Sequence, residues 1–158
     1  MTIIRSRILE GKRRKKHKST PEEKEKIVDL LKQGAGILSI EKLIGVPRTV
    51  IRTIKKGGIY PTSKSSSLYG HVTVFSEDRL MGAILDKMSP REAAAYAGIM
   101  ESVARGFWRK IGYDYLTQEE FDQLKELKAE GTSIDGIAKE TLLTDAEVRY
   151  FLPRVSKD

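Results

Sequence analysis

Three stretches of the chain repeat one pattern of apolar and polar positions, and each stretch predicts three short helices. The stretches cover residues 20–57, 76–112 and 113–158. In the first helix of each, apolar residues recur three or four positions apart, which is the spacing of one helical face. These residues are Ile27, Leu30 and Leu31, then Leu80, Ile84 and Leu85, then Phe121, Leu124 and Leu127. The repeat predicts an all-α fold of three consecutive three-helix units.

Each first helix is preceded by a hydroxyl residue, which is Thr20, Ser76 or Thr117. Such a side chain accepts a hydrogen bond from an unpaired first-turn amide, and the acidic residues that follow suit the positive end of the helix dipole. The sequence Ser-Pro-Arg-Glu at residues 89–92 predicts that a middle helix starts with Ser89 as its cap, because proline fits the first helical position. We therefore expect caps at these four residues.

A tight turn is expected after each middle helix, centred on Gly45, Gly98 and Leu142. These residues stand at nearly the same distance from the first cap of their stretch. Glycine adopts a left-handed backbone without penalty, whereas leucine does not. The third turn is therefore expected to differ in shape from the other two.

The segment GILSIEKLIGVPRTVIRTI, residues 36–54, resembles the helix-turn-helix superfamily of DNA-binding proteins. The likeness is to the trihelical domains of resolvase-like and sigma-factor-like proteins, and it extends to three tandem copies. In the first copy Gly45 takes the turn, and the core positions are taken by Ile40, Ile44, Ile51 and Ile54.

Glu41 departs from the pattern of that superfamily, which usually has a small residue four positions before the turn. Ala94 and Ala138 take the corresponding positions in the second and third stretches. A long carboxylate at this position must tilt outward or find a partner. Helix packing in the first unit is therefore expected to be slightly unusual.

The resemblance implies that the third helix of the first unit is a recognition helix, which reads base edges in the major groove. Arg48 and Arg52 are four residues apart and so share one side of this helix. Arginine donates hydrogen bonds to guanine, and lysines at the helix end suit phosphates. The predicted DNA-binding residues of this unit are Pro47, Arg48, Thr49, Arg52, Thr53, Lys55 and Lys56.

The corresponding helices of the other two units are weaker candidates. In the second unit, the predicted DNA-binding residues are Ser102, Arg105 and Arg109. Phe107 and Trp108 beside them are expected in the core rather than stacked on bases. In the third unit, the carboxylates of Asp145 and Glu147 oppose the approach of phosphates, so this unit is expected to contact a protein or a second copy of the chain.

Charge changes sign along the chain, from basic to acidic. The formal net charge of +7 is divided into +7 in residues 1–20, +4 in residues 21–70, zero in residues 71–115 and −4 in residues 116–158. A basic stretch next to a predicted recognition helix indicates a polyanionic partner for that half of the chain.

The basic arm over residues 1–19 has low hydrophobicity and strong self-repulsion, so we expect it to become ordered only when it binds a polyanion. Its predicted DNA contacts are Arg13, Arg14, Lys15 and Lys16. Such an arm can enter a minor groove or follow phosphates, and the affinity would then fall steeply with salt. Nuclear-import signals have a similar composition.

Residues 58–75 are rich in glycine, serine and tyrosine and lack helical periodicity, which predicts a flexible linker between two independent units. An alternative for residues 71–75 is a short strand, because their apolar positions alternate weakly. The link between the second and third units is much shorter, so we expect those two units to keep a restricted orientation.

Several classes of protein are not expected from the composition. The chain has no cysteine and only two histidines, which argues against disulfides, a metal site or a cofactor. No apolar run approaches the length of a membrane span, so no membrane partner is expected and the protein is predicted to be cytoplasmic and nucleoid-associated, or nuclear in a eukaryotic host. The carboxylates fall in capping turns or on exposed helix faces, which argues against an enzyme.

Two functions of different class stay open at this point. The first is a sequence-specific double-stranded DNA-binding regulator of transcription, in a phage or mobile element. The second is an adaptor that holds nucleic acid with its basic end and recruits a polymerase, recombinase or packaging enzyme with its acidic C-terminal unit.

Overall fold

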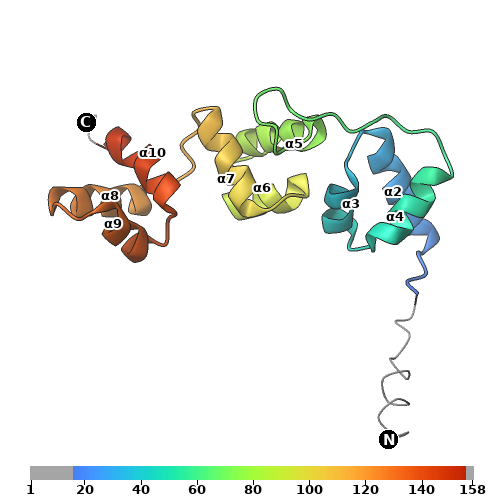
Figure 1. The fold of residues 1–158 in the computed structure, drawn as a ribbon, viewed down its shortest axis with the longest axis horizontal. Helices are drawn as coiled ribbons and strands as arrows, with labels where there is room; N and C mark the ends of the chain where they lie inside the picture. Colours follow the sequence, from blue (N-terminus) through green and yellow to red (C-terminus); the bar gives the residue numbers. More distant parts are fainter. Residues whose placement is uncertain (1–15, 156–158) are drawn as a thin grey trace, which may run out of the picture. The chain divides into compact units, whose positions relative to one another are not determined.

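The computed structural model describes residues 16–155, and its regular elements are short helices (Figure 1). The helices are α2 (Pro21–Lys32), α3 (Ile37–Ile44), α4 (Arg48–Lys56), α5 (Val74–Leu85), α6 (Pro90–Ala97), α7 (Glu101–Lys110), α8 (Gln118–Ala129), α9 (Ile134–Thr141) and α10 (Asp145–Val155). The prediction of an all-α fold is confirmed, since extended pairing within this range is limited to one antiparallel bridge, between Ser65 and Thr73. None of the described helices is long and apolar enough to cross a membrane.

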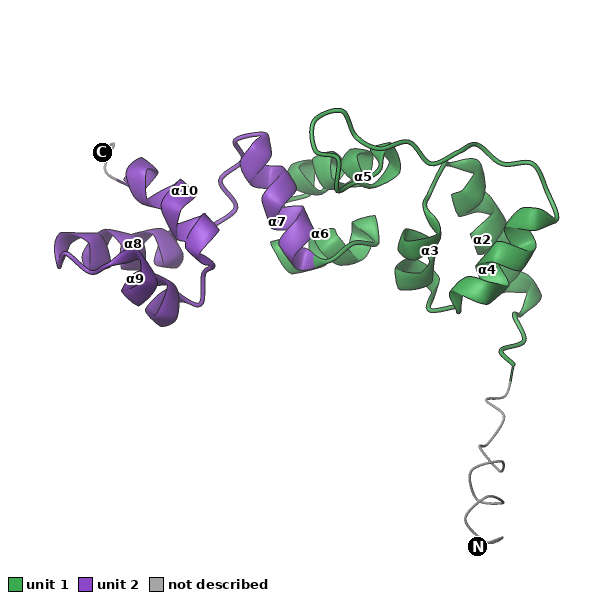
Figure 2. Cartoon of the chain, in the orientation of Figure 1, with its two compact units in different colours: residues 1–100 green, residues 101–158 purple. Residues whose placement is uncertain are grey.

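The chain divides into two compact units, with the boundary after residue 100 (Figure 2). Unit 1 contains α2 to α6, and unit 2 contains α7 to α10. The boundary therefore runs through the middle one of the three helix groups that the sequence predicts. The arrangement into three helix-turn-helix units stays a prediction.

Helices α2, α3 and α4 pack around one apolar cluster in unit 1. The buried members are Ile27, Leu30, Leu31, Ala35, Ile40, Val46, Ile51 and Phe75. Thr20 caps α2 as predicted, because its side chain accepts a hydrogen bond from the amide of Glu23 at 3.1 Å. The cluster fixes which side of each helix faces inward, and thereby which side of α4 faces solvent.

Helix α5 begins earlier than the sequence predicts. Its cap is Thr73, whose side chain accepts a hydrogen bond from the amide of Ser76. Ser76, the predicted cap, is instead buried within the helix, where its Oγ donates to the carbonyl of Ala97 at 3.0 Å. The prediction of a cap at Ser76 is therefore wrong. Thr73 and Ser76 both precede acidic residues, so the local sequence does not distinguish them, and only the contact of Ser76 with Ala97 shows which of the two is buried.

The second part of the connection between α4 and α5, residues 64–74, is held by local hydrogen bonds, so the expectation of a flexible linker is wrong for these residues. The amide of Ser66 donates to the carbonyl of Val72 at 2.9 Å, and the amide of Val74 donates to that of Lys64 at 2.8 Å. Ser66 and Val72 are both buried. The predicted strand over residues 71–75 is reduced to the bridge at Thr73, because α5 starts at the next residue.

Helices on either side of this connection also pack together, so the first two predicted units are not independent of each other. Helix α3 packs on α6, and the turn after α6 approaches the α3 backbone closely. A Cβ added to Gly98 would lie only 2.7 Å from the carbonyl oxygen of Ser39. Ser39 and Ser76 are buried beside this contact, with their hydroxyl oxygens 3.5 Å apart. Unit 1 is therefore a single body of five helices within the described residues.

The residue that ends α3, α6 and α9 has the same left-handed backbone in all three cases. The φ angles are +78° at Gly45, +68° at Gly98 and +62° at Leu142. The expectation that the third turn has another shape is therefore wrong. Leu142 adopts the conformation that the other two positions give to glycine, and its side chain is 92% exposed.

Replacing Leu142 with glycine is expected to stabilise unit 2 by about 1 kcal/mol, because the left-handed conformation strains a residue that has a Cβ atom. Little packing is lost, since the leucine side chain is almost fully exposed. Urea denaturation followed by the fluorescence of Trp108, the one tryptophan of the chain, measures the change. Leu142→Ala keeps the strain and should leave the midpoint nearly unchanged, so equal stabilisation by alanine and glycine would contradict this account.

In unit 2, α8, α9 and α10 pack on one another. Thr117 and Glu120 form the predicted capping box at the start of α8, each side chain bonded to the other's backbone amide. Phe107 and Trp108 of α7 are fully buried, as predicted. The ring of Trp108 lies 5.0 Å from that of Tyr113, nearly perpendicular to it.

Candidate nucleic-acid interface

Helix α4 is anchored by its apolar side and leaves its polar side in solvent. Ile51 is fully buried, and Val50 and Ile54 pack against the same cluster. Among the predicted DNA-binding residues of α4 and its cap, Lys55 is partly buried and the others are exposed, namely Pro47, Arg48, Thr49, Arg52, Thr53 and Lys56. The structure therefore brings all seven predicted residues of this unit to one helix and its start.

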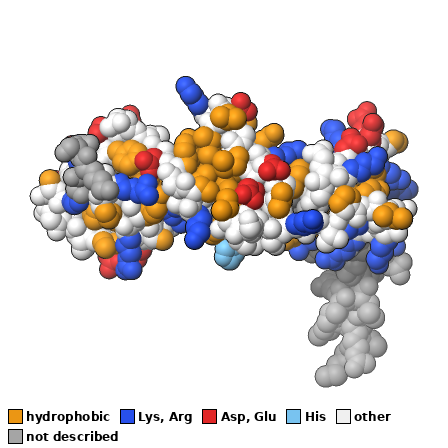
Figure 3. Space-filling model, turned by 90° about the horizontal axis from the view of Figure 1, so that it is seen from above, with side chains coloured by type: hydrophobic (Ala, Val, Ile, Leu, Met, Phe, Trp, Pro, Cys, Tyr) orange, Lys and Arg blue, Asp and Glu red, His pale blue; other side chains and the backbone are white. Residues whose placement is uncertain are grey.

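The α3–α4 segment is strongly cationic. Residues 37–56 contain five Lys or Arg residues and a single carboxylate, Glu41. Helix α4 itself contains no acidic residue, and Lys55 and Lys56 in its last turn suit the negative end of the helix dipole. Lys and Arg side chains gather around the end of the molecule that carries α2 and α4 (Figure 3). This surface suits a polyanion.

The carboxylate of Glu41 finds its partner in Arg48, across the turn between α3 and α4. The Nε of Arg48 donates to Oε2 of Glu41 at 2.9 Å. This contact answers the sequence expectation that Glu41 must tilt outward or pair. It also neutralises the only negative charge of the segment.

The two threonines of α4 differ in what they can offer to a ligand. Thr53 Oγ1 donates to the carbonyl of Thr49 at 2.9 Å, so its hydroxyl proton is already used within the helix. Arg52, one position before Thr53, is exposed and has no hydrogen-bond or ion-pair partner among the described residues. Arg52 is therefore the most available donor on this side of α4.

The arm is described only at its end. Lys16 is exposed, and His17 lies 3.1 Å from the carboxylate of Glu23 near the start of α2. The other predicted contacts of the arm, Arg13, Arg14 and Lys15, lie outside the described residues.

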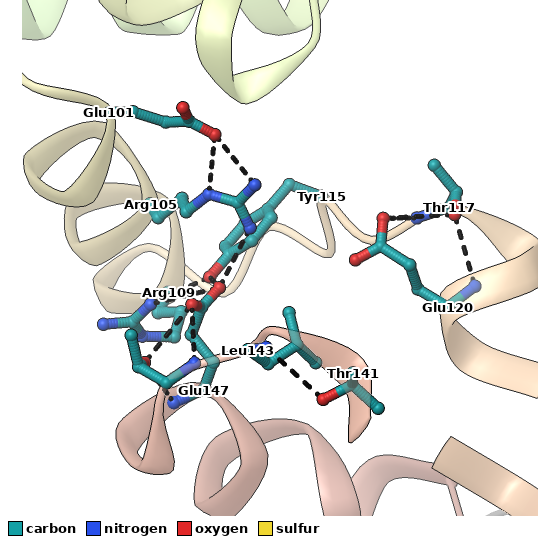
Figure 4. A network of polar contacts seen from close by, with 10 residues as sticks. Glu101, Arg105, Arg109, Tyr115, Thr117, Glu120, Thr141, Leu143 and Glu147 are labelled. Carbon is teal, nitrogen blue, oxygen red and sulfur yellow. Dashed lines mark hydrogen bonds and ion pairs between the residues drawn. The ribbon is translucent and has the colours of Figure 1, made fainter. Parts of the chain in front are cut away.

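Two of the three predicted DNA-binding residues of α7, Arg105 and Arg109, lie in a polar network inside unit 2 (Figure 4). Arg105 donates to Oε1 of Glu101 through Nε and Nη2, at 3.1 and 2.9 Å, and to Oε2 of Glu147 through Nη1 at 3.0 Å. Arg109 Nη1 donates to the hydroxyl of Tyr115 at 2.8 Å. Because both guanidinium groups are held by internal partners, we restrict the candidate interface to unit 1. Ser102, the third predicted residue of α7, is exposed.

Glu147 is the centre of that network and is buried. The Tyr115 hydroxyl donates to its Oε2 at 2.7 Å, and the amide and hydroxyl of Thr144 donate to its Oε1, each at 3.2 Å. Burial raises the pKa of Glu147, but the hydrogen bonds from Tyr115 and Thr144 and the charge of Arg105 outweigh it, so the pKa lies below its ordinary value. Burial, with the bond to Glu147, raises the pKa of Tyr115 above its ordinary range.

Sequence reasoning missed the roles of Glu147 and Tyr115. It placed Glu147 on an open face where it would repel phosphates, whereas the structure buries this side chain against two arginines. One local signal could have indicated that Glu147 has an internal partner, because Thr144 and Glu147 have the spacing of a capping box. Their reciprocal side chain to backbone hydrogen bonds are present. The contact with Arg105 spans 42 residues and has no local signal.

No protein-family model, curated protein or solved structure matches this chain.

Proposed function

We propose that the protein binds double-stranded DNA in a sequence-specific manner, with α4 in the major groove and the basic arm on phosphates or in the minor groove. The observation that carries the proposal is the exposed, acid-free side of α4, which presents Arg48, Arg52 and Lys56 while its opposite side is fixed in the core. A major groove admits one α-helix, and arginine is the residue that most often reads guanine there. The role that this supports best is a regulator that recognises a DNA site.

The charges of the segment support a polyanion-binding helix face rather than a purely structural one. A surface helix without a polyanionic partner usually mixes charges of both signs, because opposite charges four residues apart stabilise it. Helix α4 has four cations and no acid, so its own side chains repel one another in the free protein. Phosphates remove that repulsion.

The proposal predicts that Arg52→Ala lowers the affinity for a preferred duplex by roughly tenfold or more, because one base or phosphate contact is lost. The preferred duplex is obtained by selecting bound molecules from a randomised pool with the full chain. Fluorescence anisotropy titrations at several salt concentrations then give the affinity and its salt dependence.

Arg91→Ala is the matched control. It removes an equal charge from an exposed position on α6 of the same unit. We expect it to change the affinity by about twofold at most, because it alters only the overall electrostatic field of the protein. Equal losses for the two variants on preferred and random duplexes would exclude base reading by α4, and a wild-type chain that ignores duplexes in dilute buffer would exclude the function itself.

A further inference from the structure

The ion pair between Glu41 and Arg48 uses only part of the arginine. The Nε atom donates to the carboxylate, and neither terminal nitrogen of Arg48 has a hydrogen-bond partner among the described residues. The exposed fractions of the two side chains are 35% for Glu41 and 50% for Arg48. A pair this exposed contributes little to the stability of the fold.

Packing does not require a carboxylate at this place in the motif. The corresponding residues before the turns at Gly98 and Leu142 are Ala94 and Ala138, and both lie in helices that are followed by a residue of the same left-handed conformation as Gly45. Alanine is also the better helix former. A carboxylate in this cationic segment should lower the affinity of the segment for any polyanion, so the presence of Glu41 needs another reason.

The geometry of the guanidinium group supplies that reason. Its donors form a rigid planar fork, and the two terminal nitrogens match the O6 and N7 acceptors that guanine presents in the major groove. Fixing Nε from one side holds the plane of the fork while both terminal nitrogens stay free. A fixed arginine loses less rotamer freedom when it meets the base, and it is less able to swing to a phosphate.

We propose that Glu41 is a positioning residue that holds Arg48 so that its two terminal nitrogens read one guanine. The proposal rests on the DNA-binding function proposed above and narrows it to a particular base contact. In this role Glu41 lowers the affinity of the protein for every duplex, and it raises the discrimination between duplexes with and without that guanine. The two effects can be separated, because the first acts on every duplex and the second only on duplexes that carry the guanine.

The test compares the affinity for the selected duplex with that for the same duplex in which the preferred guanine pair is replaced by an adenine–thymine pair. We expect Glu41→Ala to reduce this ratio by about fivefold while the affinity for a random duplex stays equal or rises. Arg48→Ala should reduce the ratio at least as much. Adding Glu41→Ala to Arg48→Ala should change the ratio no further, because the carboxylate acts through the arginine.

Glu25→Ala is the matched control, since it removes a carboxylate from an exposed position on α2. It should leave the ratio unchanged, and circular dichroism should show that the Glu41 and Glu25 variants keep the wild-type helix content. An unchanged ratio in Glu41→Ala, or an equal further loss in the Arg48→Ala background, would overturn the role of Glu41. In that event a loss of affinity in Arg52→Ala would still uphold the DNA-binding function, whereas a wild-type chain that binds no duplex would overturn both.

Discussion

Replacing Gly98 with alanine is expected to destabilise unit 1 by about 3–4 kcal/mol. Two costs add at this position. The backbone has a φ of +68°, which strains any residue with a Cβ, and that Cβ would lie 2.7 Å from the carbonyl oxygen of Ser39 and 3.0 Å from Cγ of Leu43. The backbone of α3 cannot yield without moving the helix, so the turn after α6 must separate from it.

Urea denaturation followed by circular dichroism measures this loss, and Trp108 fluorescence reports on unit 2 in the same sample. Gly45→Ala is the control that separates strain from contact. Gly45 has a φ of +78°, but an added Cβ would meet no atom within 4 Å. Its replacement should cost only about 1 kcal/mol. Equal losses at the two glycines would mean that α3 and the turn after α6 are not in close contact in solution.

Replacing Glu147 with alanine is expected to destabilise unit 2 by about 3 kcal/mol. The substitution removes the acceptor of Tyr115, Arg105 and Thr144 together and leaves two mostly buried guanidinium groups short of one anion. Glu101 still neutralises Arg105, which keeps the loss below that of an isolated buried charge. Trp108 fluorescence during urea denaturation measures the change.

The same residue makes unit 2 sensitive to acid. The pKa of Glu147 in the folded chain lies below its ordinary value of 4.5. A group with a lowered pKa stabilises the fold fully above its unfolded pKa, and that stability is lost as the pH falls through the folded pKa. We therefore expect the urea midpoint of unit 2 to fall below about pH 4.5 more steeply in the wild type than in Glu147→Ala.

Glu126→Ala serves as the control for both measurements, because Glu126 is exposed on α8. It should change the midpoint little at neutral pH and leave the acid dependence as in the wild type. An acid dependence that survives unchanged in Glu147→Ala would show that other carboxylates cause it.

The helices and turns could be predicted from the sequence because their signals are local. Thr20, Ser89 and Thr117 cap the helices that follow them, as their spacing to acidic residues or proline indicates. Gly45 and Gly98 end their helices where the repeat predicts a turn. These features depend on residues within a few positions of each other, so one chain segment contains all the information.

The features that could not be predicted depend on contacts between distant segments. Ser76 is buried where its hydroxyl donates to the carbonyl of Ala97, and the turn at Gly98 packs against the backbone of Ser39. Arg105 donates to Glu147, which lies on another helix. The exposed side of α4 could be predicted because its apolar positions define it, but the pairing that neutralises the arginines of α7 could not. Burial of polar groups follows from their partners, and the partners are set only by the tertiary fold.

The close approach of Gly98 to the α3 backbone also determines how a smaller fragment for testing the proposed DNA binding can be designed. A fragment cut after α4, where the first repeat ends, would expose the buried side of α3 at Ser39 and remove Phe75 from the apolar cluster. Such a fragment would retain every side chain of α4 but would lack part of the core that supports this helix. The shortest autonomous fragment is therefore expected to extend to about residue 100, where the first compact unit ends.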